Sequence, residues 1–305
     1  MKPMMASKLS KLPLGMKAAL LGIVLMLAIA PSQPVPVHAQ QQPVVATWMW
    51  NTFSIWTDRA NTLDALQRNG ITLLFLQIDT DIPADIYRSF LAEAAQRGIE
   101  VHALDGAPDW VLPRSSAKLY QFIDWVKTFN ARALPAEQFR GIHLDVEPHV
   151  LPEWYADQDA VIGLLMDTIS GFVEEVKSDS ALITGASLPV WLDAFNVRDG
   201  YGGRTTLSDR LIRQLDQTTL MAYRNSTENI LTSVSKELDE AEKAGKPVIV
   251  GVETLNNYEP DTSFYDKGRA ELNAALSTVV AASAGKASFA GYAVHEFSSW
   301  LTLRD

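Results

Sequence analysis

The segment FRGIHLDVEP, residues 139–148, carries the pattern that indicates the fold. Its apolar residues are Ile142, Leu144 and Val146, and the residues between and around them are Gly141, His143, Asp145 and Glu147. Alternation with a period of two residues is typical of a β-strand whose two faces meet different surroundings. The sequence therefore predicts a strand with one apolar face and one face that carries an imidazole and two carboxyl groups.

Seven other short segments rich in strand-forming residues occur along the chain, separated by stretches with helical periodicity. The eight predicted strands are 44–51, 71–79, 99–106, 139–148, 182–191, 217–225, 247–255 and 288–297. Alternating strands and helices predict a parallel sheet, and eight such units in about 250 residues suit a closed (β/α)8 barrel of the TIM type. After the last strand only SSWLTLRD remains, so we expect a short or missing eighth helix.

The main alternative to the barrel is an open, doubly wound sheet. That fold favours a glycine-rich phosphate-binding turn after the first strand, and none follows residues 44–51. Two helical stretches end in glycine directly before the next strand, at Gly98 and Gly245, as the C-termini of helices commonly do. These glycines support a strict order of strand, helix and strand.

The first 39 residues have the composition of a secretory signal peptide. Lysines precede the apolar run AALLGIVLMLAIA, and the small residues Val37 and Ala39 suit cleavage after Ala39. The alternative, a membrane anchor, would need roughly 20 apolar residues, and this run has 13. We therefore expect a secreted or extracytoplasmic protein, with residues 40–46 as a disordered lead-in and a single barrel domain at 47–305.

Composition limits the classes of partner. The chain has a net charge of −10, and removal of residues 1–39, which carry four lysines and no acids, changes it to −14. An acidic surface argues against nucleic acid or anionic lipid as the partner, and we expect no stable membrane insertion after cleavage. The chain contains no cysteine, which excludes disulfides and thiolate sites. It also lacks the G-x-S-x-G elbow of many serine hydrolases.

In a barrel, alternate residues of each strand point inward, and functional side chains lie at the carboxyl ends of the strands. If the apolar face of the fourth strand packs against helices, His143, Asp145 and Glu147 point inward, with Glu147 at the mouth. Burial and a neighbouring carboxyl would raise the pKa of Glu147, as a general acid requires. Asp145 would support it, and His143 could hydrogen-bond to Asp145. The alternative is a structural network in which the three residues only satisfy one another.

Other predicted strands also end in polar residues. The further candidates for catalysis or substrate binding are Asp79, Asp105, Tyr223, Asn225, Glu253 and Glu296. Any one acid among them could instead cap a helix or form an ion pair in a loop, and for Asp79, Asp105 and Glu296 taken singly that is the stronger interpretation. Their common placement at one end of the strands predicts a polar mouth.

Seven of the eight tryptophans lie in or near the ends of predicted strands, and only Trp125 lies within a helix. The candidates for platforms that stack against sugar rings are Trp50, Trp110, Trp191 and Trp300. A flat aromatic ring offers a large apolar face without charge. The alternative is that some of these rings fill the barrel, which suits Trp48 or Trp50 best.

The fourth predicted strand resembles a motif of the chitinase-like family 18 glycoside hydrolases. FRGIHLDVEP is similar to the D-G-x-D-x-D-x-E strand of that family, and Gly141, Asp145 and Glu147 match. Arg140 and His143 stand where the family has its first two acids. The resemblance implies that Glu147 is a proton donor and that Asp145 orients an N-acetyl group that attacks the anomeric carbon.

Two further segments resemble the same family. LMAYR is similar to its sixth-strand M-x-Y motif, through Met221 and Tyr223. GKPVIVGV, residues 245–252, resembles a motif of its seventh strand. The resemblance implies that Tyr223 helps to hold the acetamido group of the substrate.

A second glycosidase mechanism uses other residues. Large retaining barrel families carry an acid/base Glu, often followed by Pro, at the end of strand four and a nucleophilic Glu at the end of strand seven. Glu147, Pro148 and Glu253 resemble that arrangement. Retaining enzymes hold their two carboxyl groups about 5–5.5 Å apart and inverting enzymes roughly 6.5–9.5 Å apart. Both mechanisms use Glu147.

Two other classes of function remain open. In a metal-dependent amidase or deacetylase, imidazole and carboxylate ligands would hold zinc. The candidate ligands are His143, Asp145, Glu147 and His149. They converge poorly on one ion if they are spaced along a single strand. Alternatively, the barrel could bind a glycan without cleaving it. We favour an exported glycoside hydrolase that acts on a polysaccharide or cell-wall glycan and needs no cofactor and no resident metal.

Overall fold

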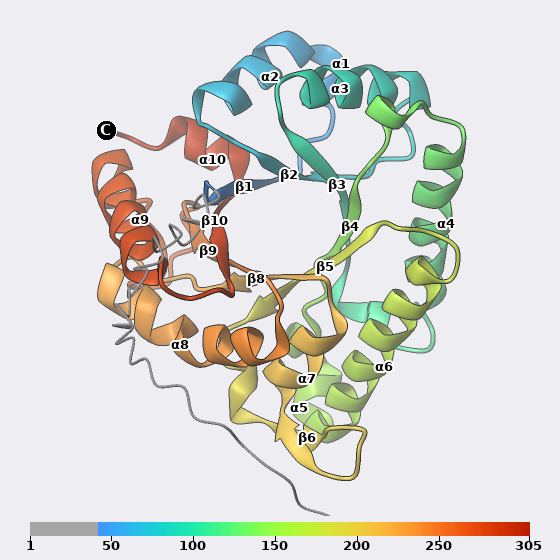
Figure 1. Ribbon diagram of the computed structural model, residues 1–305, viewed down its shortest axis with the longest axis vertical. Helices are drawn as coiled ribbons and strands as arrows, with labels where there is room; N and C mark the ends of the chain where they lie inside the picture. Colours follow the sequence, from blue (N-terminus) through green and yellow to red (C-terminus); the bar gives the residue numbers. More distant parts are fainter. Residues whose placement is uncertain (1–41) are drawn as a thin grey trace, which may run out of the picture. The chain divides into compact units, whose positions relative to one another are not determined.

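A computed structural model describes residues 42–305 and shows a closed barrel of eight parallel strands (Figure 1). The barrel strands are β1 (Val44–Met49), β2 (Leu73–Gln77), β3 (Glu100–Asp105), β4 (Gly141–Leu144), β5 (Ile183–Pro189), β8 (Gln217–Met221), β9 (Val248–Glu253) and β10 (Phe289–His295). They follow one another around the ring in chain order, and β10 pairs with β1 to close it. The predicted (β/α)8 barrel is therefore confirmed.

Helices surround the ring of strands (Figure 1). The α-helices are α1 (Ser54–Thr57), α2 (Arg59–Arg68), α3 (Ala84–Gln96), α4 (Ala117–Ala131), α5 (Pro152–Ala156), α6 (Gln158–Lys177), α7 (Leu207–Gln214), α8 (Thr227–Ala244), α9 (Arg269–Ser283) and α10 (Phe297–Thr302). Short 3-10 turns are η1 (Pro108–Val111), η2 (Pro135–Glu137), η3 (Pro148–Val150) and η4 (Leu192–Ala194). Helix α10, which follows the last strand, has six residues, so the predicted short eighth helix is confirmed.

The two predicted C-terminal glycines adopt the conformation that ends a helix. Gly98 follows α3 with φ of 73°, and Gly245 follows α8 with φ of 65°. These values lie in the left-handed region, which glycine occupies without a steric penalty. Both glycines let the chain turn from a helix into the next strand of the barrel.

One insertion departs from the simple alternation of strands and helices. Between β5 and α7 the chain forms an antiparallel pair, β6 (Asn196–Arg198) and β7 (Arg204–Thr206), which lies outside the ring (Figure 1). The carboxylate of Asp199 accepts hydrogen bonds from the backbone N–H groups of Tyr201 and Gly203 and shapes the turn. The insertion enlarges the loop at the carboxyl end of β5.

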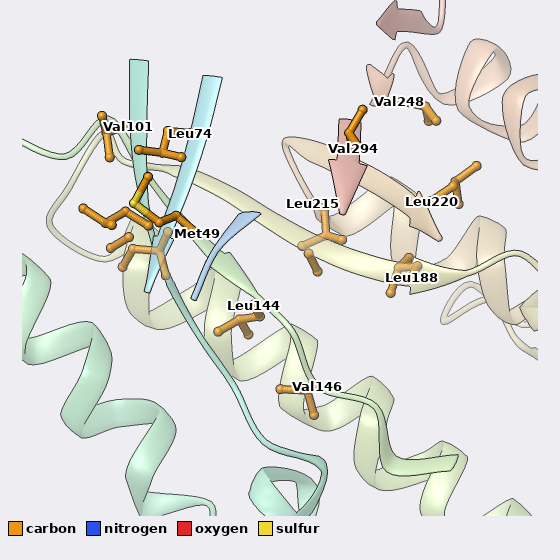
Figure 2. Close-up of a cluster of buried hydrophobic side chains, with 14 of the residues drawn as sticks. Met49, Leu74, Val101, Leu144, Val146, Leu188, Leu215, Leu220, Val248 and Val294 are labelled. Atoms are coloured by element: carbon orange, nitrogen blue, oxygen red, sulfur yellow. The ribbon is translucent and has the colours of Figure 1, made fainter. Parts of the chain in front are cut away.

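A continuous apolar layer lies between the strands and the helices. Figure 2 shows part of it, with side chains labelled at Met49, Leu74, Val101, Leu144, Val146, Leu188, Leu215, Leu220, Val248 and Val294. Ile142 is buried in the same layer. The apolar face of the fourth strand therefore packs toward the helices, as predicted, and the alternate residues face the barrel.

The barrel interior holds large rings, for which glycines leave room. Trp48 and Phe75 pack with their ring centroids 5.4 Å apart, and Phe75 stacks on His143 at 3.9 Å. A Cβ atom at Gly185 would lie 2.9 Å from Nδ1 of His143, and one at Gly251 would lie 3.1 Å from the Trp48 ring. Such short contacts would force a ring to move. The glycines therefore allow both Trp48 and His143 to fill the interior.

The first barrel strand begins at its predicted residue. Strand β1 starts at Val44, as the predicted strand 44–51 does, and it includes residues 44–46 of the predicted lead-in. The predicted signal peptide, residues 1–39, lies outside the residues that the structure describes. Within residues 42–305, no helix has the length and apolar content that a membrane span requires.

Candidate active site

Two carboxyl groups directly follow the end of β4. Leu144 belongs to the helix-facing layer, so alternation directs Asp145 and Glu147 toward the barrel axis. The register of β4 and β5 pairs Leu144 with Ala186, which places Asp145 beside Ser187. The carboxyl groups thus stand at the carboxyl ends of the strands, where barrels carry functional side chains.

Both carboxyl groups have raised pKa values. Burial raises the pKa of Asp145 to about 7, and the charge of Glu147 adds to the rise, whereas His295 and the Ser187 hydroxyl oppose it. Burial also raises the pKa of Glu147, against the opposing charge of His295. Asp145 Oδ1 is buried and has no hydrogen-bond partner among residues 42–305. Burial thus favours the protonated form of both carboxyl groups, and at Asp145 the charge of Glu147 adds to this effect.

A third carboxyl group, at Glu253, is fixed by hydrogen bonds. Glu253 ends β9 and is 4% exposed. Its Oε1 accepts the backbone N–H groups of Thr254 and Leu255, each over 2.7 Å, and its Oε2 lies 2.9 Å from Nδ1 of His295. Both oxygens are therefore engaged, and this favours a supporting role for Glu253 over nucleophilic attack on a sugar.

His295 links Glu253 to a tryptophan of the first strand. The indole N–H of Trp50 donates to His295 Nε2 over 3.1 Å, so Nε2 must be unprotonated. The ring hydrogen is therefore on Nδ1, which donates it to Glu253. Burial lowers the pKa of His295, but Glu253, Asp145 and Glu296 outweigh this effect and the net shift is upward. Protonation of His295 would require the Trp50 N–H to turn away, because two N–H groups cannot donate to each other.

Tyr223 lies close to all three carboxyl groups. Burial, and then the charges of Glu253, Asp145 and Glu147, raise its pKa well above the ordinary value. Its ring centroid lies 5.7 Å from that of His295. Part of the residue still reaches the surface. The hydroxyl therefore stays protonated and can donate a hydrogen bond to a group bound in the mouth.

An aromatic wall, made of His149, Trp154, Trp191 and Phe195, borders Glu147. His149 Nε2 lies 3.7 Å from Glu147 Oε2, and burial lowers the pKa of His149. The His149 ring packs edge-on against Trp191 at 5.0 Å, and Trp191 also contacts Trp154 at 5.9 Å and Phe195 at 6.0 Å. Trp191 is 37% exposed, so this rigidly held ring keeps area free for a ligand.

Two predicted acids shape loops and do not join the cluster. Asp79 Oδ1 accepts the backbone N–H of Asp81 over 2.9 Å. Asp105 Oδ1 accepts the backbone N–H of Gly106, also over 2.9 Å. Leu104 is buried inside the barrel, so alternation directs Asp105 away from the interior. Each acid therefore has a hydrogen-bonding role in its loop, and its role in substrate binding stays a prediction.

Glu296 does not enter the barrel either. Its carboxylate accepts the N–H groups of Ser298 and Ser299 and caps α10, and its role in substrate binding stays a prediction. Ala293 is buried inside the barrel, so alternation along β10 directs His295 inward and Glu296 outward. His295 is a site residue that the sequence-based prediction lacks. The alternation within its own strand is the signal that identifies it.

Two of the predicted stacking tryptophans are buried in the helix-facing layer. Trp110 is 5% exposed and packs against Phe122 at a centroid distance of 6.1 Å. Trp300, in α10, is 4% exposed. Both rings are therefore largely covered by hydrophobic packing, and their contact with sugar stays a prediction. Trp50 and Trp191 remain partly exposed.

The remaining predicted residues lie at the end of β8. Met221 pairs in register with Gly251 and is partly buried. Leu220 belongs to the helix-facing layer, so Met221 faces the barrel side. The backbone N–H of Asn225 donates to the carbonyl of Asp261 over 3.1 Å, which connects the loop after β8 to the loop after β9. Met221 thus lines the mouth, and Asn225 lies in a loop at its rim.

The four candidate zinc ligands do not form a metal site. His143 Nε2 lies 3.0 Å from Ser187 Oγ inside the barrel, whereas His149 belongs to the aromatic wall beside Glu147. In the part of the chain that the structure describes, no three His, Asp or Glu side chains are placed to hold a metal ion. The amidase alternative therefore lacks a ligand set among residues 42–305.

Gly106 allows the loop after β3 to approach the segment after β4. A Cβ atom at this position would lie 2.1 Å from the carbonyl oxygen of Asp145. We expect Gly106→Ala to displace Asp145 and to lower the free energy of unfolding by about 1–3 kcal/mol, measured by urea denaturation. The control is Gly163→Ala in α6, where a Cβ atom would meet nothing within 4 Å. That change should be neutral or stabilising, and equal destabilisation of both variants would contradict the prediction.

Comparison with known proteins identifies the fold. No family model and no curated protein matches the sequence. A mutant of the family 18 chitinase from Cycas revoluta, in complex with (GlcNAc)4, is similar at 12% identity and a TM-score of 0.51, over 84% of this chain and 95% of that one. A chitinase from Bacteroides thetaiotaomicron is similar at 10% identity and a TM-score of 0.53, over 85% of this chain and 91% of that one.

A third similar structure is an exo-β-1,4-mannosidase from an Opitutaceae bacterium, at 13% identity and a TM-score of 0.53. The match covers 83% of this chain and 51% of the mannosidase, so this chain spans about half of its length. The chain therefore has a glycoside hydrolase-like barrel fold. Within that class it shares the fold of the family 18 chitinases, as the resemblance of its fourth strand predicts.

Proposed function

We propose that this chain is an exported glycoside hydrolase that acts on a polysaccharide or cell-wall glycan. Glu147 is the general acid and Asp145 the supporting carboxylate. The observation that carries the proposal is the placement of Asp145 and Glu147 directly after β4 at the barrel mouth, where burial raises the pKa of both carboxyl groups. Cleavage of a glycosidic bond requires an acid that protonates the leaving oxygen, and burial favours the protonated form of Glu147 that can do this.

The resemblance to family 18 supports a mechanism without an enzymic nucleophile. The carbonyl oxygen of the substrate's N-acetyl group attacks the anomeric carbon while Glu147 passes its proton to the leaving oxygen. Asp145 orients the acetamido group, and the Tyr223 hydroxyl donates a hydrogen bond to it. The Glu147 carboxylate then takes a proton from the water that opens the cyclic intermediate, which restores the acid.

Glu253 is the candidate nucleophile of the alternative, covalent mechanism. Its hydrogen bonds to Thr254, Leu255 and His295 support a structural role instead. We expect Glu253→Gln to retain most of the single-turnover rate, because glutamine keeps an oxygen that can accept the two backbone N–H groups. Its NH2 group would face the Nδ1–H of His295, so the variant loses that one hydrogen bond. A loss of several orders of magnitude would indicate a covalent glycosyl intermediate.

The direct test of the function is hydrolysis across a panel of glycans. The panel contains N-acetylglucosamine oligomers, peptidoglycan and neutral β-glucans, and the release of reducing ends is measured for residues 40–305. The chitinase structure in complex with (GlcNAc)4 is the reason to include the N-acetylglucosamine oligomers. Cleavage of at least one glycan is expected. Tight binding of a glycan without cleavage would contradict the proposal and indicate a binding protein.

Export is the part of the proposal that rests on the N-terminal sequence. We expect the mature protein to begin at Gln40 and to be found outside the cytoplasmic membrane, because residues 1–39 have the composition of a cleaved signal peptide. N-terminal sequencing of the protein from fractionated cells is the measurement. A cytosolic protein that retains residues 18–30 would contradict the prediction.

A further inference from the structure

The hydroxyl of Ser187 lies among three polar side chains inside the barrel. Trp48 Nε1 donates to Ser187 Oγ over 3.2 Å, and His143 Nε2 lies 3.0 Å from the same oxygen. Strand register places Asp145 beside Ser187, with both side chains on the barrel side. Trp48, His143 and Ser187 are all at most 2% exposed. Solvent therefore has no access to this contact.

The number of hydrogens decides the direction of these bonds. A hydroxyl group has two lone pairs and one hydrogen, and an indole N–H can only donate. Trp48 thus occupies one lone pair of Ser187. We infer that Ser187 is a positioning residue for Asp145, and that His143, with its hydrogen on Nε2, occupies the second lone pair and directs the Ser187 hydroxyl hydrogen to that carboxyl group.

The surroundings of His143 support this tautomer. Burial and, secondly, the charge of His102 lower the pKa of His143 well below its ordinary value, so the ring is neutral and has one N–H. Phe75 stacks on the ring and Gly185 leaves space for it, which fixes its orientation. Nδ1 is buried without a partner among the described residues. An unpaired acceptor is tolerated better than an unpaired N–H donor, so the hydrogen belongs on Nε2.

In this inference the Ser187 hydroxyl acts on Asp145 together with the other titratable neighbours of Asp145, which are Glu147, His295 and Tyr223. A hydroxyl hydrogen directed at the carboxyl favours its charged form, in opposition to burial and to the charge of Glu147. The inference deepens the proposed function, because Asp145 is its supporting carboxylate. The test of the inference about Ser187 needs no substrate, so this inference and the proposed function can each fail without the other.

The experiment is carbon-13 NMR of the aspartate carboxyl groups across pH, with the Asp145 signal assigned by its loss in Asp145→Asn. We expect Ser187→Ala to raise the titration midpoint of Asp145 by roughly one pH unit, because a hydrogen bond to a charged group is lost. Ser187→Thr keeps the hydroxyl and should restore the midpoint. The matched control is Thr47→Val, which removes a buried hydroxyl that donates to the Val294 carbonyl, and it should leave the midpoint unchanged.

The tautomer of His143 is read from nitrogen-15 NMR of the unaltered protein, which requires no variant to fold. The hydrogen is expected on Nε2. A hydrogen on Nδ1, or an unchanged Asp145 midpoint in folded Ser187→Ala, would overturn the inference. If the NMR results hold but no glycan is cleaved, the proposed function fails and the positioning of Asp145 by Ser187 stands.

Discussion

Glu147→Gln should lower the rate of glycan hydrolysis by about a thousandfold or more, because glutamine cannot give a proton to the leaving oxygen. The substitution keeps the size of the side chain, so the aromatic wall beside it should remain in place. The measurement is kcat on a glycan that the unaltered protein cleaves, together with a thermal unfolding curve that verifies the fold.

The control for this variant is Glu259→Gln. Glu259 is exposed in the loop after β9, and its substitution should leave kcat unchanged. Full activity of Glu147→Gln would remove both the acetamido mechanism and the covalent mechanism, because both assign the proton to Glu147.

Asp145→Asn should have two opposite effects. Turnover should fall at least about a hundredfold, because the charge that supports the reacting acetamido group is lost. Stability should rise, because the pKa of Asp145 is raised from 3.8 to about 7 by burial and Glu147. A group whose pKa is higher in the folded state than in the unfolded state makes its full contribution to stability only at a pH below its unfolded-state pKa. For Asp145 this contribution is lost as the pH rises from about 4 to about 7.

The variant cannot titrate at this position, so its stability advantage should grow between about pH 4 and pH 7 and reach the order of 4 kcal/mol. Urea denaturation at a series of pH values measures it. Glu237→Gln in α8 is the matched control, because burial raises the pKa of Glu237 to about 8 and its Oε1 is buried without a partner among residues 42–305. That variant should also gain stability with pH, but it should keep its turnover. A pH-independent difference for Asp145→Asn would contradict the prediction.

The barrel could be predicted because each strand carries its own local signal. Alternating apolar residues at Ile142, Leu144 and Val146 specify both the strand and its two faces, and glycines such as Gly245 mark the ends of helices. These signals depend on neighbours in the sequence alone. The same alternation directs Asp145 and Glu147 toward the barrel axis.

The partners within the site depend on closure of the barrel and are not encoded locally. His295 meets Glu253 from 42 residues away, because β9 and β10 pair in parallel register. Ser187 meets Trp48 from a strand 139 residues away, through the interior of the barrel. No spacing in the sequence predicts such contacts.

The tryptophans show a second limit of sequence-based prediction. Trp110 and Trp191 both follow strand ends, yet Trp110 is buried beside Phe122 and Trp191 stays 37% exposed. Position after a strand places a ring near the mouth, but the packing of the adjoining helix decides which face remains free. Burial of an aromatic ring in a loop is therefore a property of the tertiary structure.

The most direct test of the central claim compares the single-turnover rates of Glu147→Gln and Glu253→Gln on one glycan that the unaltered protein cleaves. The proposed mechanism assigns the proton to Glu147 and only a supporting role to Glu253. It predicts that Glu147→Gln is slower than Glu253→Gln by at least about a hundredfold. Equal rates, or a slower Glu253→Gln, would contradict the assignment of Glu147 as the acid of a mechanism without an enzymic nucleophile.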